Sequence, residues 1–470
     1  MNPETARLAR RRRVFDRLEA RVVELYLAKP DDDVYPLYQG LRYALSLARL
    51  TTVRTADGTD VEVDGPVQLH AWAIRDLLAA PLADAKSLWT LSRLMPEVVQ
   101  RTRQARSSLL EHLPIDRDSL EAEITTRLLA VASGGGGGAG YVYPGCYEML
   151  EKHGLAPSLM VGTSIGGLMA MFRARRARYD FAPLVAAARA LSWGEVFRVL
   201  QTENRYGLPA TLRLQLRHVL GPMFRTDEGR SMWLSDMGIP LYLIASGITV
   251  DALKHDLSYY ENLLDDDVQR LGVRASVRSG FKAMSVLREF LGSRDALHEV
   301  VLGRTPGTED FDVLDATGFS AAIPGIIHYD VLRDDARMKR ILDRLYAEHG
   351  ITRLGEGGMV SNVPARVAWE SVVDGRLGRR NVFVMALDCF APNPRKFGWY
   401  PMMQAVRSAN VEEDLEFADF YLDFSRTLSP MNLVPPLRDA LTAIRWGRER
   451  IAPHMPFIVE MMAPIEVLRD

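Results

Sequence analysis

The stretch from residue 128 to residue 172 most constrains how this chain can fold. It reads LLAVASGGGGGAGYVYPGCYEMLEKHGLAPSLMVGTSIGGLMAMF. Leu128 to Ala132 predicts a short apolar strand, which five consecutive glycines follow. A helix then leads to a second short strand from Leu159 to Val161, and a third segment opens another helix. Short apolar strands that alternate with helices indicate an α/β fold.

The second strand of this stretch runs into a G-x-S-x-G sequence, in which Ser164 is the central residue. This pattern is typical of a nucleophile elbow, a sharp strand-to-helix turn that exposes a serine hydroxyl to a substrate. Gly162 and Gly166 flank the serine, as expected where a turn leaves no room for side chains. Ser164 is therefore the candidate nucleophile.

The glycine run offers consecutive backbone N–H groups that no side chain obstructs. Such groups suit an anion or the oxyanion that develops during acyl transfer. An oxyanion site explains both the glycines and the serine, whereas a simple turn does not need the entropic cost of five glycines. The candidate donors are Gly135, Gly136, Gly137 and Gly138.

The same glycines formally match a dinucleotide-binding pattern. Gly135, Gly137 and Gly140 satisfy G-x-G-x-x-G between a strand and a helix. That pattern also requires an acidic residue at the end of the second strand, about 20 positions on, to bind the ribose. Here the second strand ends in Val161-Gly162-Thr163-Ser164, so a nucleophile stands where the acid should be. We therefore expect no organic cofactor.

Composition and charge exclude several classes of function. The net charge of −2 gives no reason to expect nucleic acid as a partner. Cys146 and Cys389 lie far apart and lack metal-ligand spacing, which favours a reducing compartment and no metal site. The chain contains neither a signal-peptide pattern nor an apolar stretch of membrane-spanning length. We expect a cytoplasmic protein, and the sequence sets no oligomeric state.

Two basic stretches keep open a peripheral contact with a membrane surface. The first comprises Arg10 to Arg13, for which a solvated helix face is the favoured interpretation. The second falls in a long segment from Asp251 to about Asp310, which could be a lid or a membrane contact. Its basic residues recur every four positions and are Arg270, Arg274, Arg278 and Lys282.

Outside the glycine-rich stretch, the pattern divides the chain into three parts. Residues 1–124 are predicted to be mainly helical, with a small hairpin on Asp57-Gly58. Residues 125–395 contain further short apolar strands, which indicate a mainly parallel sheet covered on both faces. Residues 396–470 are predicted to be helical and are rich in aromatic residues and methionine. The further strands are expected at 239–246, 311–314, 351–354 and 381–387.

In parallel sheets the functional residues lie at the carboxyl ends of the strands. Ser164, Glu356 and Asp388 all follow predicted strands directly, so we expect them along one edge of the sheet.

At this point the chain resembles the patatin-like phospholipase family, through four motifs in the family's order. They are the glycine motif Gly135 to Gly140, the elbow Gly162 to Gly166, the segment Ser320-Ala321-Ala322-Ile323-Pro324, and Glu356-Gly357-Gly358 leading to Asn362-Val363-Pro364-Ala365.

The resemblance implies a three-layer patatin-like α/β fold and a serine–carboxylate dyad without metal or cofactor. Ser164 would attack an acyl ester of a phospholipid or glyceride, and the carboxylate would take its proton. The family's aspartate position is occupied by Glu356, whose side chain is one carbon longer, and its frequent cation position by Ala139. The lack of that cation bears on the substrate more than on activity.

Three alternatives stay open at this stage. Asp388, with Asp251 behind it, is the alternative base. A Ser164–Asp388–His454 triad meets the order of residues found in other serine hydrolases. The rival from another class is a catalytically weak lipid-binding or regulatory protein that keeps the fold.

Overall fold

The structure is a computed structural model, which describes residues 3–199, 205–208, 210–249, 297–393, 403–404 and 406–469. The second basic stretch and Asp251 lie outside the described residues. No helix in the described ranges is long and apolar enough to cross a membrane.

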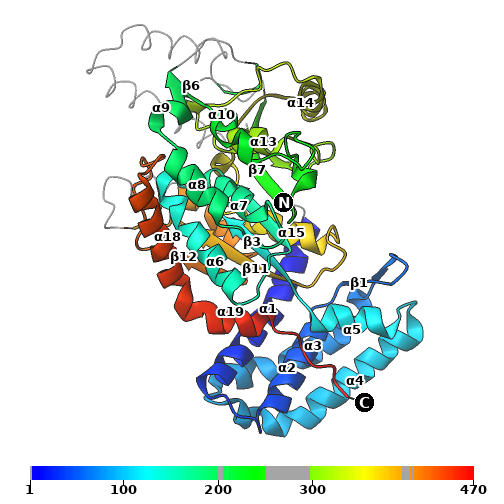
Figure 1. Ribbon diagram of the computed structural model, residues 1–470. Coiled ribbons are helices and arrows are strands. Elements are labelled where there is room, and N and C mark those ends of the chain that lie inside the picture. Colours follow the sequence, from blue (N-terminus) through cyan, green and yellow to red (C-terminus); the bar gives the residue numbers. More distant parts are fainter. Residues whose placement is uncertain are drawn as a thin grey trace.

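A seven-stranded sheet forms the centre of the described chain (Figure 1). Its order is β10-β7-β4-β3-β11-β12, and β8 also pairs with β7. In this order, β7, β4, β3, β11 and β12 each run parallel to the next strand, whereas β8 and β10 are antiparallel to β7. The prediction of an α/β fold with a mainly parallel sheet is thus confirmed. The strands are β3 (Leu128–Ser133), β4 (Leu159–Thr163), β7 (Leu241–Thr249), β8 (Leu297–Leu302), β10 (Ile351–Glu356), β11 (Val382–Asp388) and β12 (Phe420–Asp423).

Both faces of this sheet are buried, which explains why its strands are apolar throughout. In β3, Leu129 and Val131 pack into one core, whereas Ala130 and Ala132 pack into the other. Helices α6 and α7 cover the first face, and α15 covers the second (Figure 1). The result is the three-layer arrangement that the resemblance implies.

The helices around the sheet vary widely in length. The longer ones are α6 (Tyr143–Lys152), α7 (Ile165–Ala174), α8 (Ala182–Ala190), α13 (Val313–Ser320), α14 (Ala336–His349), α15 (Ala365–Val373), α18 (Leu437–Ile451) and α19 (Met455–Met462). Shorter α-helices are α9 (Trp193–Val196), α10 (Leu216–Leu220) and α17 (Glu412–Leu415). The 3₁₀ helices are η2 (Gly137–Val142), η3 (Gly221–Met223), η4 (Leu234–Asp236), η7 (Gly357–Met359) and η9 (Ala452–His454), and η8 (Arg407–Val411) is a π-helix. A small separate sheet contains β5 (Phe197–Val199), β6 (Ala210–Leu214) and β9 (Gly325–His328).

The strand predicted at residues 311–314 is wrong. Helix α13 already begins at Val313, because the Asp312 carboxylate accepts hydrogen bonds from the amides of Leu314 and Asp315. An aspartate in this position is a strong helix start. A short apolar run does not distinguish a strand from a buried helix.

The N-terminal region is mainly helical, as predicted, and its hairpin turns at Gly58, which has a φ of +88°. Helices α2 to α5 gather at one end of the molecule, whereas α1 begins beside the central sheet, and the C-terminus returns to lie beside α4 (Figure 1). The elements are α1 (Pro3–Ala28), α2 (Tyr35–Ala48), β1 (Thr52–Arg54), β2 (Asp60–Glu62), α3 (Asp64–Asp84), η1 (Leu88–Leu94), α4 (Met95–His112) and α5 (Arg117–Thr125).

The C-terminal region does more than add helices. It supplies β12 to the central sheet, and α18 lies in backbone contact with α6. A Cβ atom on Gly145 would lie 2.0 Å from the carbonyl oxygen of Ile444, and one on Gly447 would lie 1.9 Å from that of Val142. The two glycines therefore allow a closer approach of the helices than any side chain would permit. The region predicted to be helical thus also contributes a strand to the central sheet.

The arginines at positions 10 to 13 also differ from the expected solvated face. Arg12 is buried and donates to the carbonyl of Arg380, and Arg13 donates to the carbonyl of Leu415. Arg11 forms an ion pair with Asp64. Three of the four arginines thus join α1 to the rest of the protein.

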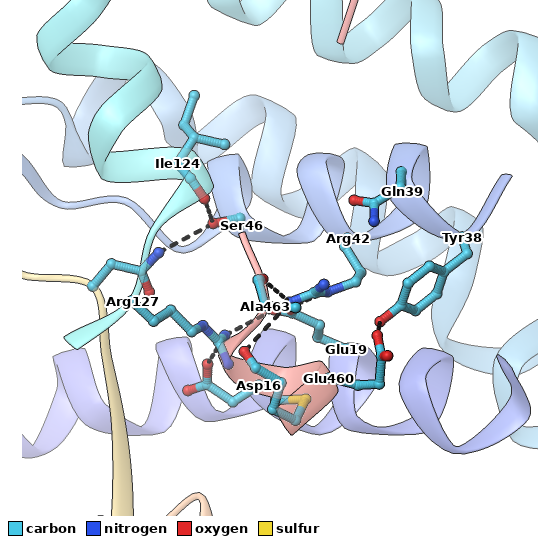
Figure 2. Close-up of polar contacts among 12 residues, drawn as sticks. Asp16, Glu19, Tyr38, Gln39, Arg42, Ser46, Ile124, Arg127, Glu460 and Ala463 are labelled. Carbon is cyan, nitrogen blue, oxygen red and sulfur yellow. Dashed lines mark hydrogen bonds and ion pairs between the residues drawn. The ribbon is translucent and has the colours of Figure 1, made fainter. Parts of the chain in front are cut away.

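A buried group of charges centred on Glu19 ties the N-terminal helices to the sheet (Figure 2). Glu19 Oε1 accepts from Arg42 at 3.0 Å, and Oε2 accepts from Arg49 at 2.6 Å and from Arg127 at 2.7 Å. Arg127 directly precedes β3, and Arg42 also donates to the carbonyl of Ala463 near the C-terminus. One carboxylate thus joins three parts of the chain.

We predict that Glu19→Ala lowers the free energy of unfolding by about 3–5 kcal/mol, because the buried Arg42 loses its carboxylate partner and Arg49 and Arg127 keep only Asp16 among the described carboxylates. Chemical denaturation would measure the loss. Glu24→Ala is the matched control on the same helix, since Glu24 is half exposed and pairs only with Arg21 among the described residues. That control should change stability by less than about 1 kcal/mol. Equal effects of the two substitutions would contradict the prediction.

Candidate functional site

The backbone at Ser164 has the geometry of a sharp strand-to-helix turn. Among the non-glycine residues that the structure describes, Ser164 alone has a positive φ, at 55°. It lies between the end of β4 and the start of α7. A Cβ atom on Gly166 would lie 2.1 Å from the carbonyl oxygen of Ser133, and one on Gly162 would lie 2.5 Å from the Cα atom of Gly167. Both flanking glycines are therefore sterically required.

Strand β7 brings Ser164 and Glu356 together. Strand β4 pairs with the first part of β7 and ends with Thr163 opposite Ile244. Strand β10 runs antiparallel to the second part of β7 and ends with Glu356 opposite Ala245. The two strands thus point toward each other along the same edge of β7, and their ends meet at consecutive residues. The residues at and just beyond those ends are Glu356 and Ser164.

The Glu356 carboxyl group is buried beside the serine. Burial raises its pKa to about 8, although the Ser164 hydroxyl and the Gly358 amide lie close enough to lower it in part. The Gly358 nitrogen lies 3.4 Å from Oε1. Oε2 is buried and makes no hydrogen bond within the part of the chain that the structure describes. The group is therefore mostly protonated at neutral pH and becomes a base as the pH rises through 8.

The segment Ser320 to Pro324 contacts both residues. Ser320 Oγ accepts a hydrogen bond of 2.9 Å from the Ser164 amide, and the carbonyl of Ala322 accepts one of 3.0 Å from the Glu356 amide. Ser320 is fully buried at the end of α13. This segment therefore fixes the backbone of the serine relative to that of the glutamate.

The glycine run curls over the same point. A Cβ atom on Gly135 would lie 3.2 Å from Ser164 Cβ. The amide of Gly135 is already engaged with the carbonyl of Asn362, and that of Gly138 with the carbonyl of Pro430. The amides of Gly136 and Gly137 donate to no residue in the described ranges. Of the four predicted donors, these two have no hydrogen-bond partner within the described residues.

An apolar pocket opens at Ser164. Its empty volume is about 880 Å³, including the space at its mouth. Helices α7, α8 and α10, strands β5 and β6, and residues 433–434 line it, and no charged side chain does so within the described ranges. Its lining includes Gly137 of the glycine run and Ser164 itself, together with Tyr141, Ile165 and Leu433. A flexible hydrocarbon chain fits such a lining.

The other predicted acid and the predicted histidine have partners of their own. The Asp388 carboxylate accepts from the Phe390 amide and the Tyr421 hydroxyl, and burial raises its pKa to about 6. Its strand, β11, is separated from β4 by β3. His454 stacks edge-on against Phe420. No contact between described residues joins Asp388 or His454 to Ser164.

Sequence reasoning missed the part that residues beyond 400 play at this site. Asn410 bonds to the loop that follows Glu356, and Pro430 and Leu433 contact the glycine run. No motif marks these residues, and a region rich in methionine and aromatic side chains conceals them. The pairing of β12 with β11 and the close contact of α18 with α6 bring this region alongside the glycine run.

The raised pKa of Glu356 predicts how stability depends on pH. The folded chain holds this proton between about pH 4.5 and 8, whereas the unfolded chain releases it near 4.5, so stability falls as the pH rises through that window. Glu356→Gln should therefore have a higher melting temperature than the wild type at pH 8 and little advantage at pH 5. Calorimetry at both values would measure this difference. An equal difference at the two pH values would contradict the prediction.

Comparison with known proteins bears on this arrangement directly. A family model described as patatin-like phospholipase matches residues 131–369, just over half of the chain. A comparison with curated proteins found no match. The matched region includes the second half of β3, the glycine run, the turn at Ser164, the Ser320 segment and β10. The chain therefore belongs to the patatin-like phospholipase family.

Proposed function

We propose that this protein hydrolyses acyl esters of lipids, with Ser164 as the nucleophile and Glu356 as the general base. Membership of the family supports a lipid acyl hydrolase in general. The observation that carries the specific assignment is the meeting of β4 and β10 on β7, which sets Ser164 against a buried carboxyl group.

The proposed reaction proceeds in two halves. In the first, Glu356 accepts the proton of the Ser164 hydroxyl as its oxygen bonds to the ester carbonyl carbon. The amides of Gly136 and Gly137 hold the oxyanion, and Glu356 returns the proton to the leaving alcohol as the ester bond breaks. In the second half, water gives a proton to Glu356 and attacks the carbonyl carbon of the acyl-enzyme. Glu356 then returns that proton to the Ser164 oxygen as the acyl–serine bond breaks, which releases the fatty acid and restores both residues.

The longer side chain at residue 356 is compatible with this role. Glu356 is the last residue of β10, and the Ser164 hydroxyl lies close enough to that carboxyl group to lower its pKa in part. Glu356 N is held by the carbonyl of Ala322, so the backbone from which the side chain extends is fixed. A general base must lie within hydrogen-bond reach of the proton that it takes.

The pocket supports a long acyl chain as the part of the substrate that is recognised. Its lining is apolar, and Ala139, where many relatives have a cation, is buried beside the glycine run. A glyceride or another ester with an uncharged group near the reacting carbonyl suits such a site better than a headgroup that needs a cation. We therefore favour acylglycerol lipase activity over phospholipase activity.

We also propose a cytoplasmic location and a functional unit that extends beyond residues 125–395. Cys146 and Cys389 are buried and neither forms a disulfide within the described residues, as suits a reducing compartment. The peripheral membrane contact proposed for residues 251–310 falls largely on residues outside the described ranges.

Ser164→Ala should abolish hydrolysis of a chromogenic acyl ester, because the acyl group then has no nucleophile to bond to. A fluorophosphonate probe should label wild-type protein at Ser164 and leave the variant unlabelled, as intact mass measurement would reveal. Hydrolysis that persists in Ser164→Ala would overturn the proposed mechanism. A wild-type protein that binds vesicles but neither hydrolyses any acyl ester nor reacts with the probe would favour a lipid-binding role.

Substitutions at residues 356 and 388 test the base. Glu356→Gln should lower kcat by about 10²–10⁴-fold, since general base catalysis is lost. Asp388→Asn should leave kcat near the wild-type value. The kcat of Glu356→Asp measures how well a carboxylate on a shorter side chain acts as the base at residue 356. In the wild type, kcat/KM should rise with pH to a plateau with a midpoint near 8, because only ionised Glu356 accepts the proton. A large loss in Asp388→Asn alone would transfer the role to Asp388.

A further inference from the structure

The loop that follows Glu356 is held by a side chain from outside the region that matches the family. Asn410 lies in the π-helix η8, about forty residues beyond the end of that region. Its Oδ1 accepts from the Asn362 amide at 3.0 Å, and its Nδ2 donates to the Gly358 carbonyl at 3.0 Å. Asn410 is buried, with 6% of its surface exposed. Both ends of one amide therefore clamp the loop from residue 357 to residue 362.

This loop touches every part of the site. The Asn362 carbonyl accepts from the Gly135 amide at the start of the glycine run. The Ser361 carbonyl accepts from the Thr163 hydroxyl, which lies next to Ser164. Gly358 N lies against the Glu356 carboxyl group. A shift of the loop would therefore move the base, the nucleophile and the oxyanion donors relative to one another.

The helical segment that carries Asn410 is itself anchored. Asp414, four residues on, is buried, bonds to the Ser361 hydroxyl and pairs with Arg366 at 3.2 Å. A π-helix is rare and is often found at functional sites, since its extra residue redirects one side chain. Here the redirected segment places the Asn410 amide between two backbone groups that lie four residues apart.

A second contact from the same part of the chain holds the glycine run. The Pro430 carbonyl accepts from the Gly138 amide at 2.9 Å, and the Leu433 carbonyl accepts from the Tyr141 hydroxyl at 3.2 Å. A Cβ atom on Gly137 would lie 2.2 Å from the Pro430 oxygen, so the two segments are in direct backbone contact. Leu433 also lines the acyl pocket.

We propose that Asn410 is a positioning residue of the active site, and that the C-terminal region completes the site through Asn410 and Pro430. This inference rests on the proposed function. Asn410 does not contact the acyl pocket but fixes the loop that follows Glu356. Placement of a reacting group to within a fraction of an ångström decides the rate, so a loop freed by about 1 Å costs on the order of 10²-fold.

Asn410→Ala and Asn410→Asp test the proposal. Asn410→Asp keeps the acceptor for Asn362 but presents an oxygen to the Gly358 carbonyl. Both variants should lower kcat by about 10²-fold with little change in KM for a short chromogenic ester. The midpoint of the pH profile should also move, because the surroundings of Glu356 change.

Asn381→Ala is the matched control. Asn381 is also a buried asparagine whose amide nitrogen bonds to two partners, the Glu123 carbonyl and the Ser46 hydroxyl, but it faces the N-terminal helices. Its removal should lower the melting temperature while kcat and the pH midpoint of the folded protein stay unchanged. Circular dichroism and thermal melting would verify that all three variants are folded at the assay temperature.

The possible outcomes distinguish the positioning role from the proposed function. Wild-type kcat and an unmoved pH midpoint in folded Asn410 variants would overturn the positioning role while the proposed function stands. The positioning role is also refuted if kcat falls only in proportion to the fraction of protein that is folded, as expected for the control. It is refuted as well if Asn410→Ala does not fold and folded Asn410→Asp has the kcat and pH midpoint of the wild type. An inactive wild type that does not react with the fluorophosphonate probe would refute the proposed function and, with it, this inference.

Discussion

The structure depends on one strand that pairs with two others along the same edge. Strand β7 is long enough for β4 to occupy its first part and β10 its second, in opposite directions. Because backbone hydrogen bonds fix the register on both sides, the ends of β4 and β10 are held at adjacent residues, Ile244 and Ala245. A serine and a carboxylate that lie far apart in the sequence thereby meet without a histidine between them.

Burial of Glu356 is the second constraint, because it strengthens the proposed base and also lowers the stability of the fold at alkaline pH. Water would solvate an ionised carboxylate, whereas the apolar surroundings favour the protonated form and raise the pKa to about 8. Once it is ionised, the proposed base is therefore a stronger proton acceptor than an exposed carboxylate. Because the ionised Glu356 carboxylate stays buried, it lowers the stability of the fold at alkaline pH. The charged group around Glu19 ties the N-terminal helices to β3 at a distance from the site, whereas α18 packs against α6 and the end of η2, next to the glycine run.

The N-terminal and C-terminal regions both lie outside the residues that match the family model, and they differ in how they contact the site. The N-terminal helices join the start of β3 through Arg127 and Glu19, and none of their described residues lines the acyl pocket. The C-terminal region instead extends the sheet through β12 and brings Asn410 and Pro430 against the two loops of the site. These contacts join the C-terminal region to the part of the chain that matches the family model.

The sequence by itself determined the α/β class, the elbow at Ser164 and the glycine run, because these depend on local rules: apolar strands buried on both faces, and turns that admit only glycine. The motif order also predicted Glu356 at a strand end. Local rules did not distinguish a strand from the Asp312-capped helix, did not reveal that β10 runs antiparallel to β7, and did not separate free amides from engaged ones. Those features depend on which distant segments pair. Only the tertiary structure decided that the Gly136 and Gly137 amides stay free of partners among the described residues and that Asn410 holds the loop beside Glu356.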